Sequence, residues 1–232
     1  MRVLRGRGET IEADRRCTDD TLRLATETGT TTLRVWTPHR QVSFGRRDVR
    51  ATGYERARLR ARANRFEPVE RDVGGTAVAY TGTTVAFALA QPVPNLRRGM
   101  QDRYERVTGA VQRALWHVGV PAQRGEPPGA FCPGSHSLSY HGKLVGVAQR
   151  VRRDAALVGG ICVVDGHAEI ADVLAPVYEE LGLALDRDAV GSVERAGASA
   201  EPTVVARAIE DRLTAGHETT VEQVADDSGV EA

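Results

Sequence analysis

The chain is organised around the stretch Gly142-Lys143-Leu144-Val145-Gly146-Val147-Ala148-Gln149-Arg150. Its Lys143 is the only lysine, so every other member of the 31 Lys and Arg residues is an arginine. An ammonium is a compact charge whose three donors can be directed at one oxygen, whereas a guanidinium is a planar fork that never deprotonates. A lysine kept in such an Arg-rich chain indicates a position that needs an ammonium. For the lysine alone, a chance codon is an equally good explanation.

Working outward, the apolar residues on both sides of Arg152-Arg153-Asp154 predict a hairpin that starts at Lys143 and ends near Val164. Polar-to-apolar periodicity predicts further strands over residues 30–36, 42–45 and 83–90, and helices over residues 21–28, 54–66, 100–118, 168–181 and 202–215. We expect Asp19-Asp20 to cap the helix over 21–28. The helix over 54–66 is expected to bury one stripe, made of Leu59, Ala63 and Phe66.

Composition restricts the class of protein. A chain of 232 residues with 41% apolar and 27% charged residues is typical of a soluble globular protein. Three cysteines without a C-x-x-C spacing indicate a reducing compartment, and neither a signal peptide nor a membrane span is recognisable, so we expect a cytoplasmic protein. Residues 201–232 carry eight acids and two arginines, which leaves the rest of the neutral chain basic. A basic body favours an anionic ligand or an acidic protein partner, and the acidic end is equally consistent with a solvated tail.

The arginines of the helix over 54–66 admit two interpretations, a solvated face or a docking site for an acidic partner. No aromatic residues interleave with them to stack on bases, so we expect no nucleic-acid partner.

A second stretch, Arg71-Asp72-Val73-Gly74-Gly75-Thr76-Ala77-Val78, joins two predicted strands. Adjacent glycines allow positive φ and let a ligand approach the backbone amides, and Arg71 supplies a cation beside them. A phosphate or carboxylate would fit there, although a simple hairpin turn explains the glycines equally well. Neither a Walker loop nor a dinucleotide fingerprint is present.

The Gly/Pro-rich run over residues 125–134 predicts a loop that delivers the chain to Lys143 and carries Cys132. Near an ammonium, Cys132 would be favoured as a thiolate and could act as a nucleophile. A buried or incidental thiol is the alternative. The spacing of Cys132, His136 and His141 does not fit a structural zinc site, so no metal is expected.

Together, the stretches over 71–78 and 142–150 resemble the two signatures of the biotin/lipoate protein ligase superfamily, and most closely those of lipoate-protein ligases and related octanoyltransferases. The resemblance covers residues 30–176. It implies an α/β fold with a mixed, largely antiparallel sheet flanked by helices. We assign residues 1–200 to this catalytic domain and residues 201–232 to a helix and a partly disordered acidic tail.

The resemblance also implies roles for single residues. It places Lys143 at the reacting carbonyl, where a desolvated ammonium stabilises developing negative charge. The glycine motif would cover the carboxylate, adenylate or thioester end of the acyl group, through Arg71, Gly74, Gly75, Thr76, Ala77 and Val78. Gly146 and Ala148 would leave room for the acyl chain beside the lysine strand.

Two chemistries share such a scaffold. Our first prediction is a lipoate-protein ligase that uses ATP and Mg²⁺ to form lipoyl-AMP. It would then lipoylate a lysine in the lipoyl domain of a 2-oxoacid dehydrogenase complex or in the glycine cleavage H protein. The alternative is an octanoyltransferase that moves octanoate from acyl carrier protein through a Cys132 thioester, and a second alternative is a non-catalytic module that binds a lipoyl domain or an acyl ligand.

Three positions depart from the ligase pattern. Glu70, Thr76 and His136-Ser137 stand where ligases usually carry an Arg, a third Gly and an Asn-Asp pair, which weakens the inference of ATP and metal contacts. The short C-terminal region predicts that a ligase of this kind would need a separate small accessory subunit.

Overall fold

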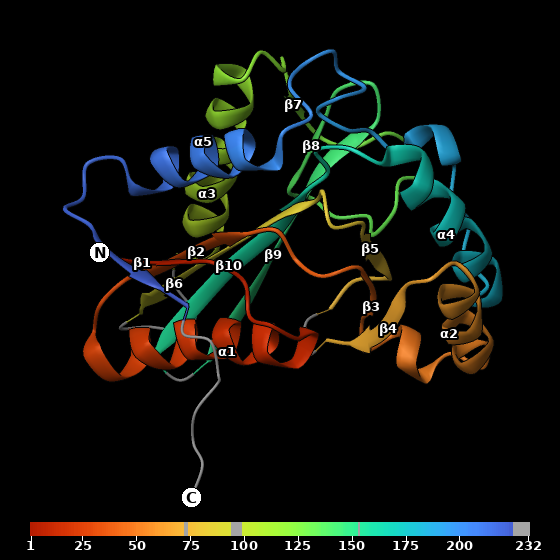
Figure 1. Cartoon of the computed structure of the whole chain (residues 1–232), viewed down its shortest axis with the longest axis horizontal. Coiled ribbons are helices and arrows are strands. Elements are labelled where there is room, and N and C mark those ends of the chain that lie inside the picture. Colours follow the sequence, from red (N-terminus) through yellow and green to blue (C-terminus); the bar gives the residue numbers. More distant parts are fainter. Residues whose placement is uncertain (72–73, 94–98, 153, 225–232) are drawn as a thin grey trace, which may run out of the picture.

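The computed structural model describes residues 1–71, 74–93, 99–152 and 154–224. Within them, the largest element is an eight-stranded sheet with the order β11-β1-β2-β6-β10-β9-β8-β7 (Figure 1). Its strands are β1 Arg2–Arg5, β2 Thr32–Trp36, β6 Val85–Pro92, β7 Gln123–Arg124, β8 Ser137–Ser139, β9 Lys143–Arg152, β10 Ala155–Cys162 and β11 Thr220–Gln223. β1 is parallel to both of its neighbours, and the remaining pairs are antiparallel. The predicted mixed, largely antiparallel sheet is confirmed.

A smaller sheet lies beside one end of the large one, with the order β4-β3-β5. Its strands are β3 Gln41–Phe44, β4 Glu67–Glu70 and β5 Val78–Tyr80. A short turn, Thr81-Gly82-Thr83-Thr84, leads from β5 into β6 of the large sheet. The glycine motif runs from the end of β4 into β5 of this small sheet, and its Asp72 and Val73 fall outside the described residues.

Helices cover both faces of the large sheet (Figure 1). They are α1 Ile11–Thr28, α2 Tyr54–Ala63, α3 Met100–His117, α4 His167–Glu180 and α5 Pro202–Thr214, with short 3-10 turns η1 Asp48–Arg50 and η2 Arg187–Ala189. α3 and α5 pack together on one face, and α1 lies on the other. α2 and α4 pack against each other next to the small sheet. No helix in the described ranges is long and apolar enough to cross a membrane.

The central strands of the large sheet carry small residues on one face, and we call this the shallow face. In β6, Val85, Phe87 and Leu89 join the core beneath α3 and α5. Ala86, Ala88 and Ala90 therefore point to the opposite face, because successive residues of a strand alternate. Ala88 is paired with Gly159, and Gly159 with Ala148, so small residues continue across β10 and β9 on that face.

Two helix predictions were wrong in detail. α1 begins at Ile11 instead of Thr21, and its N-cap is Thr10, whose side chain accepts a hydrogen bond from the Ala13 amide. The polar start of this helix is stabilised by Asp14, which is buried and accepts hydrogen bonds from Gly8, Arg34 and Trp36. In α2 the buried face consists of Tyr54, Ala57 and Ala61, whereas Leu59 is 63% exposed.

The hairpin that starts at Lys143 is confirmed, as β9 and β10, with Arg153 at its tip outside the described residues. α3 and α4 lie within a residue of their predicted bounds. At the C-terminal end, α5 packs on the core beside α3, and β11 pairs with β1. The division of the chain at residue 200 stays a prediction, and residues 225–232 of the acidic tail fall outside the described ranges.

Candidate active site

Lys143, the first residue of β9, is 1% exposed. Its Nζ donates to Glu126 Oε2 at 2.7 Å, to the carbonyl oxygen of Phe131 at 3.0 Å and to that of Cys132 at 2.7 Å. An ammonium has three donors, so these contacts use all of them. The lysine therefore holds the loop that carries Cys132 against the end of β9.

Gly146 lies beside the stem of this lysine. A Cβ atom placed on Gly146 would be 3.4 Å from Cε and 3.7 Å from Nζ of Lys143. Two residues on, Ala148 is exposed on the shallow face of the sheet. The structure thus brings both predicted residues to one face next to the ammonium, and their contact with an acyl chain stays a prediction.

Glu126 is a member of the site that sequence reasoning missed. Its Oε2 accepts hydrogen bonds from Lys143 Nζ and from Ser137 Oγ, both at 2.7 Å, and its Oε1 accepts one from the Gly134 amide at 2.9 Å. Burial alone would raise the pKa of this carboxyl group, but the hydrogen bonds from Lys143 and Ser137 outweigh it and lower the pKa below its ordinary value. Glu126 is the only acid in the Gly/Pro-rich loop over 125–134, which was the available signal.

Cys132 sits in that loop with a φ of 41°, a backbone conformation uncommon for a residue with a side chain. Its Sγ lies 3.8 Å from Nη2 of Arg71, 61 residues earlier in the chain. A Cβ atom on Gly75 would be only 2.7 Å from the same sulfur. The glycine motif and the cysteine loop therefore meet at the sulfur of Cys132, with a guanidinium beside it.

Arg71 orders the glycine motif through the backbone. Its Nη2 donates to the carbonyl oxygen of Thr76 at 2.6 Å and to that of Gly74 at 3.4 Å, and its Nη1 donates to that of Ser43. In the structure, this guanidinium thus donates its hydrogen bonds to carbonyl groups of the protein. Its predicted contact with the end of an acyl group, and those of Gly74, Gly75, Thr76, Ala77 and Val78, stay predictions.

Tyr178 of α4 ties the two loops together and was also missed. Its hydroxyl accepts from the Cys132 amide at 2.7 Å and donates to the carbonyl oxygen of Ala77 at 2.9 Å. A phenol has one proton to donate, so Thr76 Oγ1, at 2.8 Å, is the donor in the third contact. Burial, the main cause, raises the pKa of Tyr178, which keeps this hydroxyl protonated.

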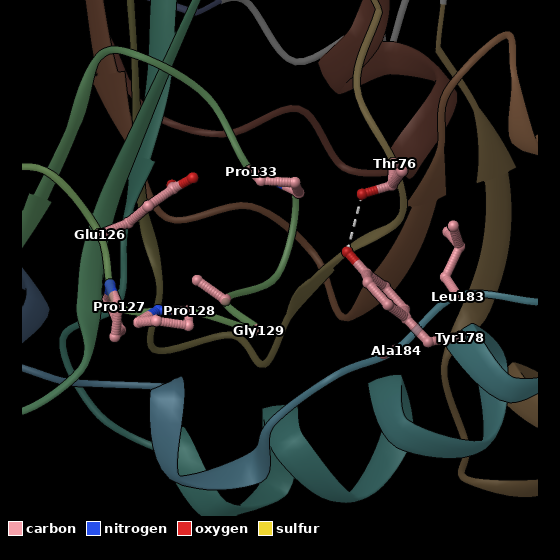
Figure 2. A pocket seen from close by; sticks show the side chains of 10 residues that line it. Thr76, Glu126, Pro127, Pro128, Gly129, Pro133, Tyr178, Leu183 and Ala184 are labelled. Carbon is pink, nitrogen blue, oxygen red and sulfur yellow. Dashed lines mark hydrogen bonds between the residues drawn. The ribbon is translucent and has the colours of Figure 1, made fainter.

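A pocket of about 390 Å³ opens in front of these loops. Figure 2 shows Glu126 on one side of it, Thr76 and Tyr178 on the other, and Pro133 between them. The remaining lining residues are Pro127, Pro128, Gly129, Ala130, Leu183 and Ala184.

The two histidines considered with Cys132 as metal ligands have other contacts. His136 stacks on Tyr104 with ring centroids 3.9 Å apart, and His141 contacts the edge of the Tyr140 ring. Within the described part of the chain, no group of three His, Cys, Asp or Glu side chains is arranged to hold a metal ion.

The site thus combines a thiol, an adjacent guanidinium and a buried ammonium, which is a set of groups suited to acyl transfer through a thioester. The fold resembles those of lipoate-protein ligases. A putative lipoate-protein ligase from T. acidophilum with bound lipoic acid is similar with a TM-score of 0.71 and 17% identity, over 97% of this chain and 89% of that one. Lipoate-protein ligase A bound with ATP gives a TM-score of 0.72 and 16% identity, over 95% and 88%.

Sequence comparison shows the family. The lipoyl protein ligase A/B catalytic domain matches residues 15–212, and the chain belongs to this family. An octanoyl-[GcvH]:protein N-octanoyltransferase from Exiguobacterium sibiricum is 30% identical over 69% of this chain and 59% of the relative. One of the same name from Geobacillus kaustophilus is 28% identical over 63% and 53%. The chain therefore spans less than two thirds of the length of these relatives.

These relatives overturn our first prediction. A lipoate-protein ligase that forms lipoyl-AMP was the wrong choice, because curated relatives that are 28–30% identical to this chain are octanoyltransferases. The ligases share the fold at 16–17% identity, which carries no information about the reaction. ATP, Mg²⁺ and a small accessory subunit were expected only with the ligase, and the comparisons do not test them.

Proposed function

We propose that this chain is an octanoyltransferase that transfers an octanoyl group between protein lysines through a thioester on Cys132. The observation that carries the proposal is the meeting of Cys132 Sγ with Arg71 at 3.8 Å, in a loop whose Cys132 carbonyl oxygen is held by Lys143. The names of the relatives support octanoyl-GcvH as the donor, in place of the acyl carrier protein that we predicted, and another protein as the acceptor. We propose that this acceptor is a lipoyl domain.

The reaction needs two transfers that mirror each other. In the first, the sulfur of Cys132 attacks the octanoyl amide carbon, a C–S bond forms, the C–N bond breaks and the thiol proton passes to the departing lysine amine. In the second, the amine of the acceptor attacks the thioester carbon, a C–N bond forms, the C–S bond breaks and a nitrogen proton returns to the sulfur. Both transfers pass through an intermediate with negative charge on the former carbonyl oxygen.

Two cations of the site are suited to that charge. The ammonium of Lys143 is desolvated and donates to two carbonyl oxygens of the cysteine loop, and we propose that it exchanges one of these contacts for the developing oxyanion. The Nη2 atom of Arg71 lies 3.8 Å from the sulfur of Cys132. Donors fixed in place in a site of low dielectric constant typically contribute about 3–4 kcal/mol each to such a transition state.

The shallow face of the sheet supports the choice of an acyl chain as the cargo. Gly146, Ala148, Gly159 and Ala88 form its floor, and Gly146 lies next to Lys143. None of these side chains extends beyond a methyl group and Ala148 is exposed, so we propose that a narrow hydrocarbon chain lies over β9 and β10, beside Ile161 and toward the buried Ala88. Its burial would contribute about 0.8 kcal/mol for each methylene group.

Intact-protein mass spectrometry tests the proposal. The purified chain is mixed with octanoyl-GcvH and an apo lipoyl domain without ATP, and both the acyl-enzyme and the octanoylated domain are measured. We expect both species with the wild-type chain, neither with Cys132→Ala, and both with Cys17→Ala as the matched control. A parallel reaction contains lipoate and ATP-Mg in place of octanoyl-GcvH, and lipoylation there that persists in Cys132→Ala would contradict the proposal. Tight binding of the lipoyl domain without any transfer, the behaviour of a non-catalytic module, would also contradict it.

A further inference from the structure

The pocket in front of the cysteine loop has mainly apolar walls and one charged lining residue, whose Oε2 is paired with the Lys143 ammonium at 2.7 Å. Pro127, Pro128, Leu183 and Ala184 give it mainly apolar walls, and Glu126 is its one ionisable side chain besides the phenol of Tyr178. Figure 2 shows the Glu126 side chain at one side of the hollow, across from Thr76 and Tyr178. An apolar channel with a carboxylate fits a ligand with an aliphatic stem and a cationic end.

The carboxylate of Glu126 has capacity for such a cation. Among the described residues, its Oε2 accepts two hydrogen bonds and its Oε1 accepts only the one from Gly134. A carboxylate offers about four acceptor positions, so Oε1 can take a further donor. The side chain is 18% exposed, which leaves it within reach of a ligand that enters from solvent.

The pocket also adjoins the reacting sulfur. Its lining residue Pro133 directly follows Cys132, and the hydroxyl of Tyr178 accepts the Cys132 amide hydrogen. On the opposite side, Thr76 follows Gly75, whose Cα is close enough to Cys132 Sγ that an added Cβ would overlap it. A stem lying in the pocket would therefore end next to the residue that we propose to carry the thioester.

We propose that this pocket is the subsite for the lysine side chain of the protein partner, with Glu126 as the ligand of its ammonium. This inference rests on the proposed function and names one substrate subsite within it. The four methylene groups of the lysine lie along the prolines and Leu183. The ammonium donates to Glu126 Oε1 before it loses a proton to solvent and attacks as the amine.

The alternative occupant, the octanoyl chain, fits this pocket less well. A carboxylate at the wall would lose its hydration to a hydrocarbon without gaining a partner, which is unfavourable. The hydrogen bonds of Glu126 keep it ionised, so this cost would not be avoided by protonation. The small residues of the sheet face carry no such charge and are better suited to the acyl chain.

A two-stage experiment separates the subsite from the chemistry. Cys132 is first acylated with p-nitrophenyl octanoate, a donor without a lysine, and the thioester is then treated with either Nα-acetyl-lysine amide or hydroxylamine. We expect Ala184→Trp, which fills the pocket from an exposed position, to slow cleavage by the lysine compound at least tenfold and to leave cleavage by hydroxylamine within twofold of wild type. Ala215→Trp, the same change at an exposed alanine after α5, should alter neither rate.

Glu126→Gln provides an independent measurement. Because Glu126 also holds the ammonium of Lys143 at 2.7 Å, we expect this variant to slow cleavage by both nucleophiles, so the readout is the ratio of the two rates. The rate with Nα-acetyl-lysine amide should fall at least tenfold further than the rate with hydroxylamine. A variant that only disturbed Lys143 would slow both to the same extent and leave the ratio unchanged, because both nucleophiles attack the same thioester.

Three results would overturn the inference. If Ala184→Trp transfers octanoate to the lysine compound at the wild-type rate, the pocket is not the subsite although the proposed function stands. If Ala184→Trp cannot be acylated by the ester, the pocket holds the acyl chain. If the wild-type chain forms no thioester at all, the proposed function fails, and this inference fails with it.

Discussion

Gly75 has no side chain, and this leaves the space that the sulfur of Cys132 fills. A Cβ atom there would lie 2.7 Å from Sγ, and the residue has a φ of 91°. The neighbouring Gly74 would meet nothing within 4 Å with the same addition. Two adjacent glycines that look equivalent in the sequence thus have different requirements in space.

We expect Gly75→Ala to lower the rate of thioester formation at least about tenfold, because the methyl group displaces the sulfur from Arg71. The positive φ should add a loss of about 1–2 kcal/mol in the free energy of unfolding. Gly74→Ala is the matched control and should stay within about 0.5 kcal/mol of wild type with normal acylation. Acylation by p-nitrophenyl octanoate and urea denaturation measure the two effects, and equal losses in both variants would contradict the argument.

The residues with distinctive chemistry could be found from the sequence, and their partners could not. Lys143 was noticeable as the only lysine, and Arg71 and Cys132 stood in a glycine motif and a Gly/Pro-rich loop. Glu126 and Tyr178 carry no such mark. Tyr178 is 101 residues from Ala77, and only the packing of α4 against the small sheet brings its hydroxyl to the site.

At the scale of elements, α4 supports the site from below the loops. Tyr178 lies in its buried face, with Val173, Leu174 and Val177, and directs its hydroxyl to three groups of the glycine motif and the cysteine loop. The helix fixes the relative position of two segments that have no regular structure of their own. Loss of this one hydroxyl would therefore leave several buried polar groups without their partner.

We expect Tyr178→Phe to destabilise the protein by about 1–3 kcal/mol, because buried polar groups lose their hydrogen bonds. Transfer of octanoate should also slow at least about tenfold, because the amide of Cys132 is no longer fixed. Tyr54→Phe is the control from the same core cluster, since the Tyr54 hydroxyl donates to Glu70 at 2.9 Å. Tyr54→Phe should lower the free energy of unfolding by about 1 kcal/mol and leave the transfer rate within twofold of wild type. Thermal denaturation and single-turnover transfer are the measurements, and a Tyr178→Phe variant with full activity would show that α4 does not position the loop.

Elements with strong periodicity were predictable, and those stabilised by polar pairing or small residues were not. The hairpin of β9 and β10 and the helix α3 have long apolar patterns. The start of α1 reads as polar, and its stability depends on Asp14 contacts that no local pattern reveals. In α2 the helix packs through alanines, so the large Leu59 was a misleading guide to the buried face.

For the whole molecule, a buried polar cluster joins α1 and the N-terminal segment to the large sheet. Asp14 accepts hydrogen bonds from Arg34, from the Gly8 amide at 3.0 Å and from Trp36 Nε1 at 2.8 Å. Arg34 is fully buried and lies over the Trp36 ring, 4.2 Å from its centroid. This cluster contributes none of the residues that we place in the site.

We expect Asp14→Asn to lower the free energy of unfolding by about 3–5 kcal/mol, because it leaves the Arg34 charge buried without a counter-ion. For a chain of this size, the melting temperature should fall by about 6–20 °C. Asp20→Asn, which removes the exposed partner of Arg23 on the same helix, should cost less than about 1 kcal/mol. The folded fraction of both variants should form the thioester at the wild-type rate, and a specific loss of acylation in Asp14→Asn would connect the cluster to the site.

The fold of the whole molecule followed from two motifs in the right order, whereas the reaction did not. Ligases and octanoyltransferases share this scaffold, so the motifs around Gly75 and Lys143 favour neither. The distinguishing feature is whether the loop before Lys143 presents a nucleophile. We propose that Cys132 is that nucleophile, and the structure adds what the sequence could not show, a guanidinium beside its sulfur from a segment 61 residues away.

An acyl group activated as a thioester can acylate amines of the protein that carries it. Here the only lysine side chain is 1% exposed and spends all three of its donors on the cysteine loop. If Cys132 carries the thioester that we propose, the one lysine near it is held by three hydrogen bonds and every other strongly basic side chain is a non-nucleophilic guanidinium, so the acyl group would be kept for the partner protein.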